Sequence, residues 1–282
     1  MKPTLIVYGS CQAEEVAGLA RTMPAISMQY EILYLASFSL AGADKPQISE
    51  KQIKACRLLW EQFDNNNPFP HYDLLPPSAQ QVMFPGIDLN CLWPFNTRDP
   101  LNAPATNLPF GRFPYGDRVV IDLMDQGLSK KEVIAAYDEA AHRIAPQLQR
   151  LLAIDTARHA EREAKCAVSI ADHVIEQLAV VRPLWTHNHP TFELLLHLFG
   201  RLCAATWDNR IKSWEIEATR YRDPFTYHQM PIHRVVADTL SLSWWNAHTE
   251  HTMPGFSKKL RYDQYIEAYT DWRFARLAMA RF

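Results

Sequence analysis

The sequence predicts an α/β fold in which a small, mostly parallel sheet is combined with a large helical portion. An apolar run over residues 4–8 is followed by Gly9 and then by a helical pattern over 13–21, which is typical of a strand-to-helix turn. A second apolar run covers 31–35, and a periodic helical pattern with few interruptions covers 129–181. Strands that alternate with helices favour a parallel sheet, and the long periodic stretch supplies the helical portion.

In the first third of the chain, we expect the two strands to be followed by a helix over residues 49–63. Two further short strands are expected at 81–84 and 90–93. Prolines concentrate in the stretch 68–114, which is too apolar for a disordered linker and favours ordered loops around a cleft.

Helix signals dominate the middle of the chain. Asp117 is expected to cap a helix, and Ser129 with Glu132 forms the pattern of a capping box at the start of the next. Pro146 is expected to kink or divide the helical run that follows.

The last third is expected to begin with a short strand and loop over residues 182–191. Pro190 suits the first turn of a helix that continues to Trp207. Two more helices are expected, roughly over 232–245 and 262–280.

The chain of 282 residues is long enough for one large domain or two unequal lobes. We expect a single domain over residues 1–282. Its α/β core is expected mainly in 1–115 and 182–207, and its helical portion in 116–181 and 208–282.

Composition excludes several classes of protein. A formal net charge of −2 without a long basic stripe argues against nucleic acid as a partner, and no apolar stretch is long enough for a membrane span. The five cysteines include no Cys-x-x-Cys pair, so neither a disulfide framework nor a zinc site is indicated. With no signal peptide at the amino terminus, we expect a protein of the reducing cytoplasm.

Cys11 is the strongest candidate for a reactive group. It follows Gly9 and Ser10 at the predicted strand-to-helix turn, where the helix amino terminus offers unpaired N–H groups and a partial positive charge. Both should favour the thiolate, so a lowered pKa and a nucleophilic role are expected. The alternative is that Cys11 is a small packing residue beneath the first helix.

A nucleophilic cysteine needs a base, and the chain has 11 histidines. His187 and His189 lie in a polar loop before a helix, where an α/β scaffold often holds a general base; an ordinary loop role is the alternative. We expect solvated side chains for three histidines of the charged helical run and a core or groove position for a fourth: His142, His159, His173 and His197.

Other sites are not indicated. The chain has no Gly-x-x-x-x-Gly-Lys-Ser/Thr loop and no Gly-x-Gly-x-x-Gly after the first strand, which argues against nucleotide hydrolysis and a standard dinucleotide fold. No His-Glu-x-x-His helix is present, and we expect no metal site.

The sequence also resembles a known family, the WcbI-type polysaccharide biosynthesis family. The resemblance rests on motifs in family order along most of the chain: Gly9-Ser10-Cys11-Gln12, Trp93-Pro-Phe-Asn96, Phe113-Pro-Tyr-Gly-Asp117, the Ser-Lys-Lys-Glu helix start, Asn188-His-Pro-Thr191 and Met230-Pro-Ile-His233.

This resemblance implies a three-layer α/β/α core related to the SGNH hydrolases, binding of coenzyme A (CoA) or acetyl-CoA, and acetyl transfer to a capsular or surface sugar. Cys11 would take the place of the SGNH serine, with Ser10 at the aspartate position. The SGNH enzymes have an aspartate three residues before the catalytic histidine, but here Thr186 stands three before His189. A Cys–His pair is therefore expected rather than a full triad.

A thiolate at Cys11 could attack the acetyl thioester. Ser10 and Gln12 would help to position the reacting groups, and the N–H groups of Cys11 and Gln12 would stabilise the oxyanion. His189 or His187 would then deprotonate the sugar hydroxyl. Alternatively, the histidine activates the sugar for direct transfer and Cys11 only positions the thioester. Contacts to CoA are expected from Gly9, Arg112, Tyr115, Arg118 and Lys130.

Two other functions stay open. One is an esterase or thioesterase that uses the same cysteine with water as the acceptor. The other is a non-catalytic protein that binds CoA or carbohydrate, with tryptophan-rich loops for sugar stacking. Neither the acceptor sugar nor the oligomeric state can be inferred from the sequence.

Overall fold

The computed structural model describes residues 2–38, 48–208, 210–217 and 221–279. The chain divides into two compact units, each built from three segments. Unit 1 comprises residues 1–87, 156–176 and 188–224, and unit 2 comprises 88–155, 177–187 and 225–282. The single-domain organisation expected from the sequence stays a prediction.

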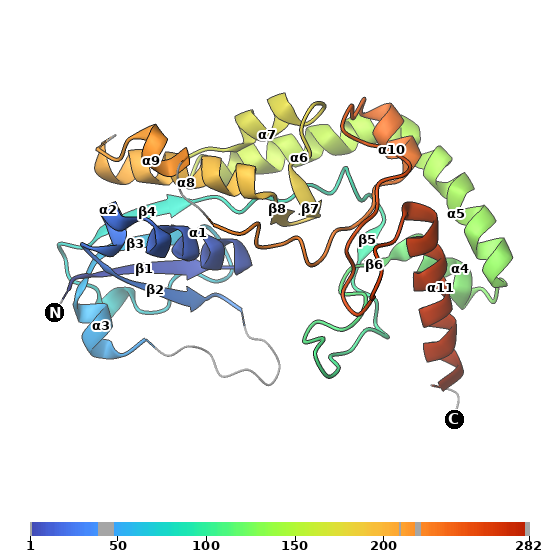
Figure 1. Ribbon diagram of the computed structural model, residues 1–282, viewed down its shortest axis with the longest axis horizontal. Helices are drawn as coiled ribbons and strands as arrows, with labels where there is room; N and C mark the ends of the chain where they lie inside the picture. Colours follow the sequence, from blue (N-terminus) through green and yellow to red (C-terminus); the bar gives the residue numbers. More distant parts are fainter. Residues whose placement is uncertain (1, 39–47, 209, 218–220, 280–282) are drawn as a thin grey trace. The chain divides into compact units, whose positions relative to one another are not determined.

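Unit 1 contains a four-stranded parallel sheet with the strand order β2-β1-β3-β4 (Figure 1). Its strands are β1 (Thr4–Gly9), β2 (Glu31–Ala36), β3 (Cys56–Gln62) and β4 (Gln80–Phe84). β1 is an interior strand and is buried throughout, which explains its continuous apolar run. The strands expected at 4–8, 31–35 and 81–84 are confirmed.

Helices cover both faces of this sheet. α1 (Cys11–Thr22) packs on β1 and β2 and also contacts α8 (Phe192–Trp207), while α3 (Glu50–Lys54) packs against β1. Trp60 of β3 reaches the α8 side, where its indole N–H donates to Thr206 Oγ1 at 2.9 Å. Ile6 and Tyr8 point to the other side, into a buried cluster with Ile53 of α3. The expected three-layer α/β/α arrangement is therefore confirmed.

The remaining elements of unit 1 are short, or their residues are divided between the two units. They are α2 (Pro24–Ser27), η1 (Tyr72–Leu74), most of α7 (Ala171–Gln177), β8 (His189–Pro190) and α9 (Ser213–Glu217). α6 (Leu148–Glu163) contributes its first half to unit 2 and its second half to unit 1.

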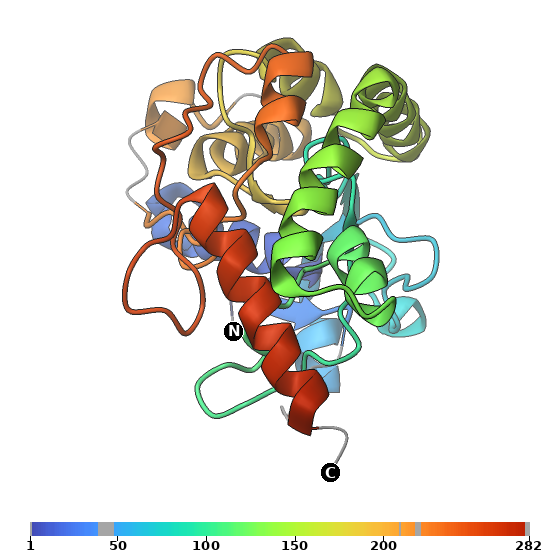
Figure 2. The same cartoon turned by 90° about the vertical axis from the view of Figure 1, so that its right-hand side faces the viewer.

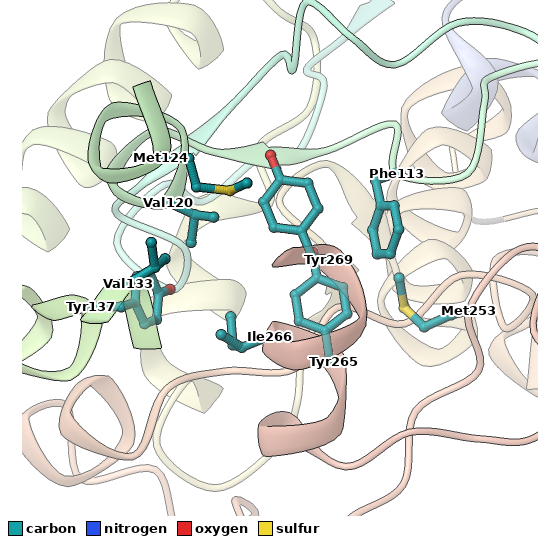
Figure 3. Close-up of a cluster of buried hydrophobic side chains, with 9 residues drawn as sticks. All are labelled: Phe113, Val120, Met124, Val133, Tyr137, Met253, Tyr265, Ile266 and Tyr269. Carbon is teal, nitrogen blue, oxygen red and sulfur yellow. The ribbon is translucent and has the colours of Figure 1, made fainter. Parts of the chain in front are cut away.

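Unit 2 is largely helical. Its elements are β5 (Asn96–Thr97), β6 (Gly116–Asp117), α4 (Arg118–Asp125), α5 (Lys130–Ile144), η2 (Ala145–Gln147), β7 (Leu184–Thr186), α10 (Arg234–Thr239) and α11 (Tyr262–Met279). α11 packs against α5 (Figure 2), and Figure 3 shows the aromatic and aliphatic side chains that α4, α5 and α11 bury between them. Ala280, the expected end of the last helix, lies outside the described residues.

Several expected caps are confirmed in unit 2. Asp117 caps α4 by accepting a hydrogen bond from the Val120 N–H group at 3.1 Å, and Ser129 forms a capping box with Glu132 at the start of α5. Burial nevertheless raises the Asp117 pKa to about 7, although Val120 and the Tyr137 hydroxyl both donate to its carboxylate. Pro146 lies in η2 and separates α5 from α6, as expected.

The prediction of one helix over residues 49–63 is wrong. The observed helix, α3, ends after Lys54, and residues 56–62 form β3 between β1 and β4. Arg57, Leu58, Glu61 and Gln62 have good helix propensity, but tertiary context overrides it. The strand is buried on both faces except at Arg57, so it lacks the alternation that usually identifies a strand.

Three smaller expectations also need correction. Residues 90–93 form turns instead of a strand, because the N–H groups of Asn90 and Cys91 donate to the Asp155 carboxylate, each at 2.8 Å. Pro190 lies before the helix and not within its first turn, since Thr191 is the cap of α8. The late helix expected over 232–245 is shorter, as α10 covers only Arg234–Thr239.

Candidate active site

Cys11 is the first residue of α1 and directly follows the carboxyl end of β1, as the sequence predicts. Ser10 is the helix cap, and its hydroxyl accepts a hydrogen bond from the Gln12 N–H group at 3.3 Å. In parallel sheets, ligands bind outside the carboxyl ends of the strands. The turn therefore places the sulfur at the edge of the sheet where chemistry is expected.

Gln62, at the carboxyl end of β3, holds this turn in place and was missed by the sequence analysis. Its Oε1 atom accepts hydrogen bonds from the Ser10 N–H group at 2.7 Å and the Ser10 hydroxyl at 2.6 Å. Its Nε2 atom donates to Gln12 Oε1 at 3.2 Å. The wrong helix assignment concealed Gln62, because only a strand brings this residue to the edge beside Gly9.

Gly9 is required by the close approach of Gln62. Its φ of +150° is one that other residues rarely adopt, and a Cβ atom there would lie 2.5 Å from Gln62 Cβ and 2.8 Å from Gln62 Oε1. Its position is thus explained by packing, and its expected contact with CoA stays a prediction.

We predict that Gly9→Ala destabilises the protein by about 1–3 kcal/mol through overpacking, in addition to backbone strain. Chemical denaturation measures this loss. Gly127→Ala is the matched control, because Gly127 also has a positive φ, +84°, but has nothing within 4 Å of an added Cβ. Equal losses in the two variants would contradict the role given to Gln62.

Gln12 connects the cysteine turn to the histidine loop. Its side chain is buried, and its Nε2 atom donates to the carbonyl oxygens of Ile87 and Asn188, each at 2.7 Å. Its Oε1 atom accepts from the Ile87 N–H group at 2.9 Å. The amide is thus occupied within the protein, which supports the positioning role expected for Gln12 and leaves its side chain unable to serve as an oxyanion donor.

The backbone donors of the turn differ in availability. The Ser10 N–H group is bonded to Gln62 and the Gln12 N–H group to the Ser10 hydroxyl. Within the described part of the chain, the Cys11 N–H group has no acceptor. The oxyanion donors expected at Cys11 and Gln12 are therefore reduced to one unengaged donor, that of Cys11.

The expectation that the Cys11 pKa is lowered is wrong. Burial raises it to about 11, and the nearby carboxylates of Glu14 and Glu15 raise it further, against smaller lowering effects of the Ser10 hydroxyl and the Gln12 N–H group. Burial penalises the charged thiolate more than the turn's donors stabilise it. At neutral pH Cys11 is therefore a thiol, and any attack by its sulfur needs a base.

We predict that alkylation of Cys11 by iodoacetamide is slow at pH 8 and accelerates about tenfold per pH unit, up to a midpoint near pH 11. The thiolate is the reacting form, so at pH 8 the folded protein should react about 100-fold more slowly at this site than the unfolded chain. Peptide mass spectrometry resolves Cys11 from the other cysteines. A midpoint near pH 7 would contradict the desolvated environment.

The two candidate histidines lie in different settings. His189 is buried and belongs to unit 1, together with Cys11 and with Asn188, whose carbonyl oxygen Gln12 holds. His187 belongs to unit 2, where its ring contacts Tyr115 edge-on at 4.8 Å between centroids. Tyr115 also contacts His228 at 5.1 Å, a buried histidine that the sequence analysis did not single out. The arrangement favours His189 as the partner of Cys11.

The basic residues expected to contact CoA all lie in unit 2 and differ in their partners. Lys130 is neutralised by Asp271, 2.8 Å away. Arg112 is exposed over the ring of Phe256, and Arg118 is exposed at the start of α4. Among the described residues, neither arginine has a carboxylate partner, so these two remain the stronger predictions for phosphate contacts.

The other histidines partly follow expectation. His142 is exposed, as expected, but His159 is fully buried, so its expected solvation is wrong. His173 is half-buried and stacks on His197, with centroids 3.8 Å apart. His197 Nε2 accepts from Arg201 Nε at 3.1 Å, which confirms a satisfied groove position.

The described residues contain no group of three or more His, Cys, Asp or Glu side chains arranged to hold a metal ion. Nor does this part of the chain include a helix with the length and apolar character of a membrane span.

The parallel sheet and the cysteine at its carboxyl edge define an α/β protein with a candidate thiol site at a strand-to-helix turn. The family model of WcbI, a polysaccharide biosynthesis enzyme, matches residues 4–206. The chain belongs to the WcbI family of polysaccharide biosynthesis enzymes.

A solved structure of WcbI has the same fold, with a TM-score of 0.75 and 17% sequence identity over 100% of this chain and 94% of that chain. That structure is described as a novel polysaccharide biosynthesis enzyme in its native form, without a disulfide bond between CoA and a cysteine. A comparison with curated proteins gives no match. The expected relation to the SGNH hydrolases stays a prediction.

Proposed function

We propose that this protein is an acetyl-CoA-dependent O-acetyltransferase that modifies a sugar in the biosynthesis of a capsular or other surface polysaccharide. Cys11 and His189 are the reacting pair. The family supports a role in polysaccharide biosynthesis, and the reference to CoA and a cysteine in the WcbI structure supports a thiol site for CoA. Of the five cysteines, Cys56, Cys91 and Cys203 are buried, and Cys11 alone follows a strand end of the sheet.

The observation that carries this proposal is the hydrogen bond from Gln12 Nε2 to Asn188 O. Gln12 is the neighbour of Cys11, and Asn188 is the neighbour of His189. A buried amide thus fixes the two backbone segments that bear the pair, as catalysis by a nucleophile and a base requires.

In the first step, His189 accepts the proton of the Cys11 thiol, and the resulting thiolate attacks the acetyl carbonyl carbon of acetyl-CoA. The bond between that carbon and the CoA sulfur breaks, and CoA leaves after its sulfur is protonated by His189. The Cys11 N–H group, which has no acceptor among the described residues, donates to the developing oxyanion. One such donor is worth about 2.7–4 kcal/mol of barrier reduction.

In the second step, His189 removes the proton of a sugar hydroxyl, whose oxygen attacks the acetyl-cysteine carbonyl. The sugar ester forms, and the Cys11 sulfur leaves and regains its proton. The raised pKa of Cys11 is consistent with this order, because the thiol is the resting form and becomes charged only when the base acts.

The test is acetyl transfer from isotopically labelled acetyl-CoA to a panel of neutral saccharides, with products identified by mass spectrometry. We expect a labelled sugar ester with the wild type and none with His189→Ala. His142→Ala is the control, because His142 is an exposed histidine of unit 2. Release of labelled acetate at the same rate with and without sugar would instead identify a thioesterase and overturn the proposal.

A further inference from the structure

Unit 1 contains a second feature at the carboxyl edge of its sheet, a hollow of about 760 Å³. Its walls come from the ends of β1 and β2 and from the loop that follows β3. The residues with polar groups in its lining are Tyr8, Ser37, Asn66, Asn67 and His71. A volume of this size is within the range of small-molecule sites.

The hollow adjoins the turn that carries Cys11. Tyr8 directly precedes Gly9 in β1, and the β1–β2 register ends with Gly9 opposite Ala36. The Ser37 N–H group donates to Gly9 O at 2.9 Å, and the Tyr34 hydroxyl donates to Ser10 O at 3.2 Å. Figure 1 shows that both strands end at the same edge.

The hydroxyl of Tyr8 has no hydrogen-bond partner among the described residues. The residue is 4% exposed and its ring is fixed edge-on against Phe69 at 5.5 Å, yet the described residues provide no hydrogen bond for its hydroxyl group. The hydroxyl is therefore open to the hollow that Tyr8 lines, and it is available to donate a hydrogen bond to a ligand there or to accept one.

The described lining of the hollow suits a neutral ligand. No Lys, Arg, Asp or Glu is among the described residues that line the hollow, whose polar groups are amides, hydroxyls and an imidazole. Asp64 lies behind the two asparagines and orders them, accepting from the Asn66 N–H group and from Asn67 Nδ2, each at 2.9 Å. Its negative charge disfavours a phosphate or carboxylate in the hollow.

Apolar surface accompanies these polar groups. Leu35, Pro68 and Pro70 also line the hollow and would pack against the carbon face of a sugar ring. Hydroxyl and amide groups combined with such apolar surface suit an uncharged ligand that is rich in hydroxyls.

We infer that this hollow binds the neutral sugar unit that accepts the acetyl group, and that Tyr8 and the Asn66–Asn67 pair recognise its hydroxyls. The inference rests on the proposed function for the identity of the reaction, but the binding itself does not require transfer. The structure thus assigns the acceptor as an uncharged part of the glycan and places it beside the Cys11 turn.

The test is saturation-transfer NMR with methyl glucoside, methyl galactoside and methyl mannoside as probes. We expect at least one glycoside to bind. Tyr8→Phe, which removes only the hydroxyl, should weaken that binding about 2- to 10-fold, the effect of one hydrogen bond. The double variant Asn66→Ala/Asn67→Ala should weaken it further.

Gln29→Ala is the matched control, because Gln29 is an exposed amide residue just before β2, at the opposite edge of the sheet. Glucose 6-phosphate is the charged comparison and should bind more weakly than the neutral glycosides. The inference is overturned if no glycoside binds, if the hollow variants bind like Gln29→Ala, or if the phosphorylated sugar binds more tightly.

A second readout separates this inference from the proposed function. CoA binding is measured by calorimetry on the same variants and should be unchanged in Tyr8→Phe. Glycoside binding that persists without any acetyl transfer would retain the hollow as a sugar site and reject the transferase. If Tyr8→Phe and the double variant transfer acetyl groups with the wild-type KM for the sugar, the transferase is retained and the hollow is rejected as the sugar site.

Discussion

Replacement of Cys11 by alanine is expected to lower the rate of acetyl transfer by roughly 10³-fold or more, because the variant has no atom to carry the acetyl group. The fold should survive, since the substitution removes a single sulfur atom from a side chain at the first residue of α1 and leaves the backbone of the turn unchanged. Release of CoA from acetyl-CoA in the presence of the acceptor measures the loss.

Cys166→Ala is the matched control for this experiment. Cys166 is also half-buried and lies in unit 1, but its thiol only donates to the Arg162 carbonyl oxygen. We expect wild-type rates from that variant. Retention of more than about a tenth of the activity in Cys11→Ala would show that the cysteine only positions the thioester, as direct transfer requires.

Replacement of Arg273 by leucine is expected to cost about 3–5 kcal/mol of the free energy of unfolding, the usual effect of breaking a buried ion pair. Arg273 lies on α11 and is 2% exposed, and its Nη1 atom is 2.7 Å from a carboxylate oxygen of the fully buried Asp99. The Tyr269 hydroxyl donates to the other oxygen of Asp99 at 2.6 Å. Without the guanidinium, Asp99 would keep a buried charge with too few partners.

Chemical denaturation of two further variants isolates this effect. Arg276→Leu is the control, because Arg276 lies on the same helix, is partly exposed over the Trp272 ring and has no carboxylate partner among the described residues. It should cost less than about 1 kcal/mol. The double variant Arg273→Leu/Asp99→Leu should recover part of the loss, since both charges are gone. Equal losses for Arg273→Leu and Arg276→Leu would contradict the account of the ion pair.

Local signals were sufficient to predict the parts of the fold that depend on local physics. The strand at 4–8 is followed by glycine, and the caps at Asp117 and Ser129 have the side chains that helix starts require. β3 could not be predicted in this way. Its residues have helix propensity, and its strand conformation depends on β1 and β4, which lie beside it only in the folded chain.

In the candidate site, too, local features could be predicted from the sequence and features that depend on tertiary contacts could not. The position of Cys11 at the turn followed from the pattern around Gly9, but its protonation state did not, because desolvation depends on the atoms packed around the sulfur. The contact of Gln62 with Ser10 could not be predicted either, because the two residues are 52 positions apart in the sequence. The proposal of His189 over His187 rests on the long-range hydrogen bond from Gln12 to Asn188, which no local pattern predicts.

The central claim is that Cys11 carries the acetyl group, and intact-protein mass spectrometry after incubation with acetyl-CoA tests it most directly. The account predicts a mass increase of one acetyl group in the wild type and in Cys166→Ala, lost on addition of the acceptor and absent from Cys11→Ala. Binding of CoA with no such increase in the wild type, while acetyl transfer proceeds, would contradict it.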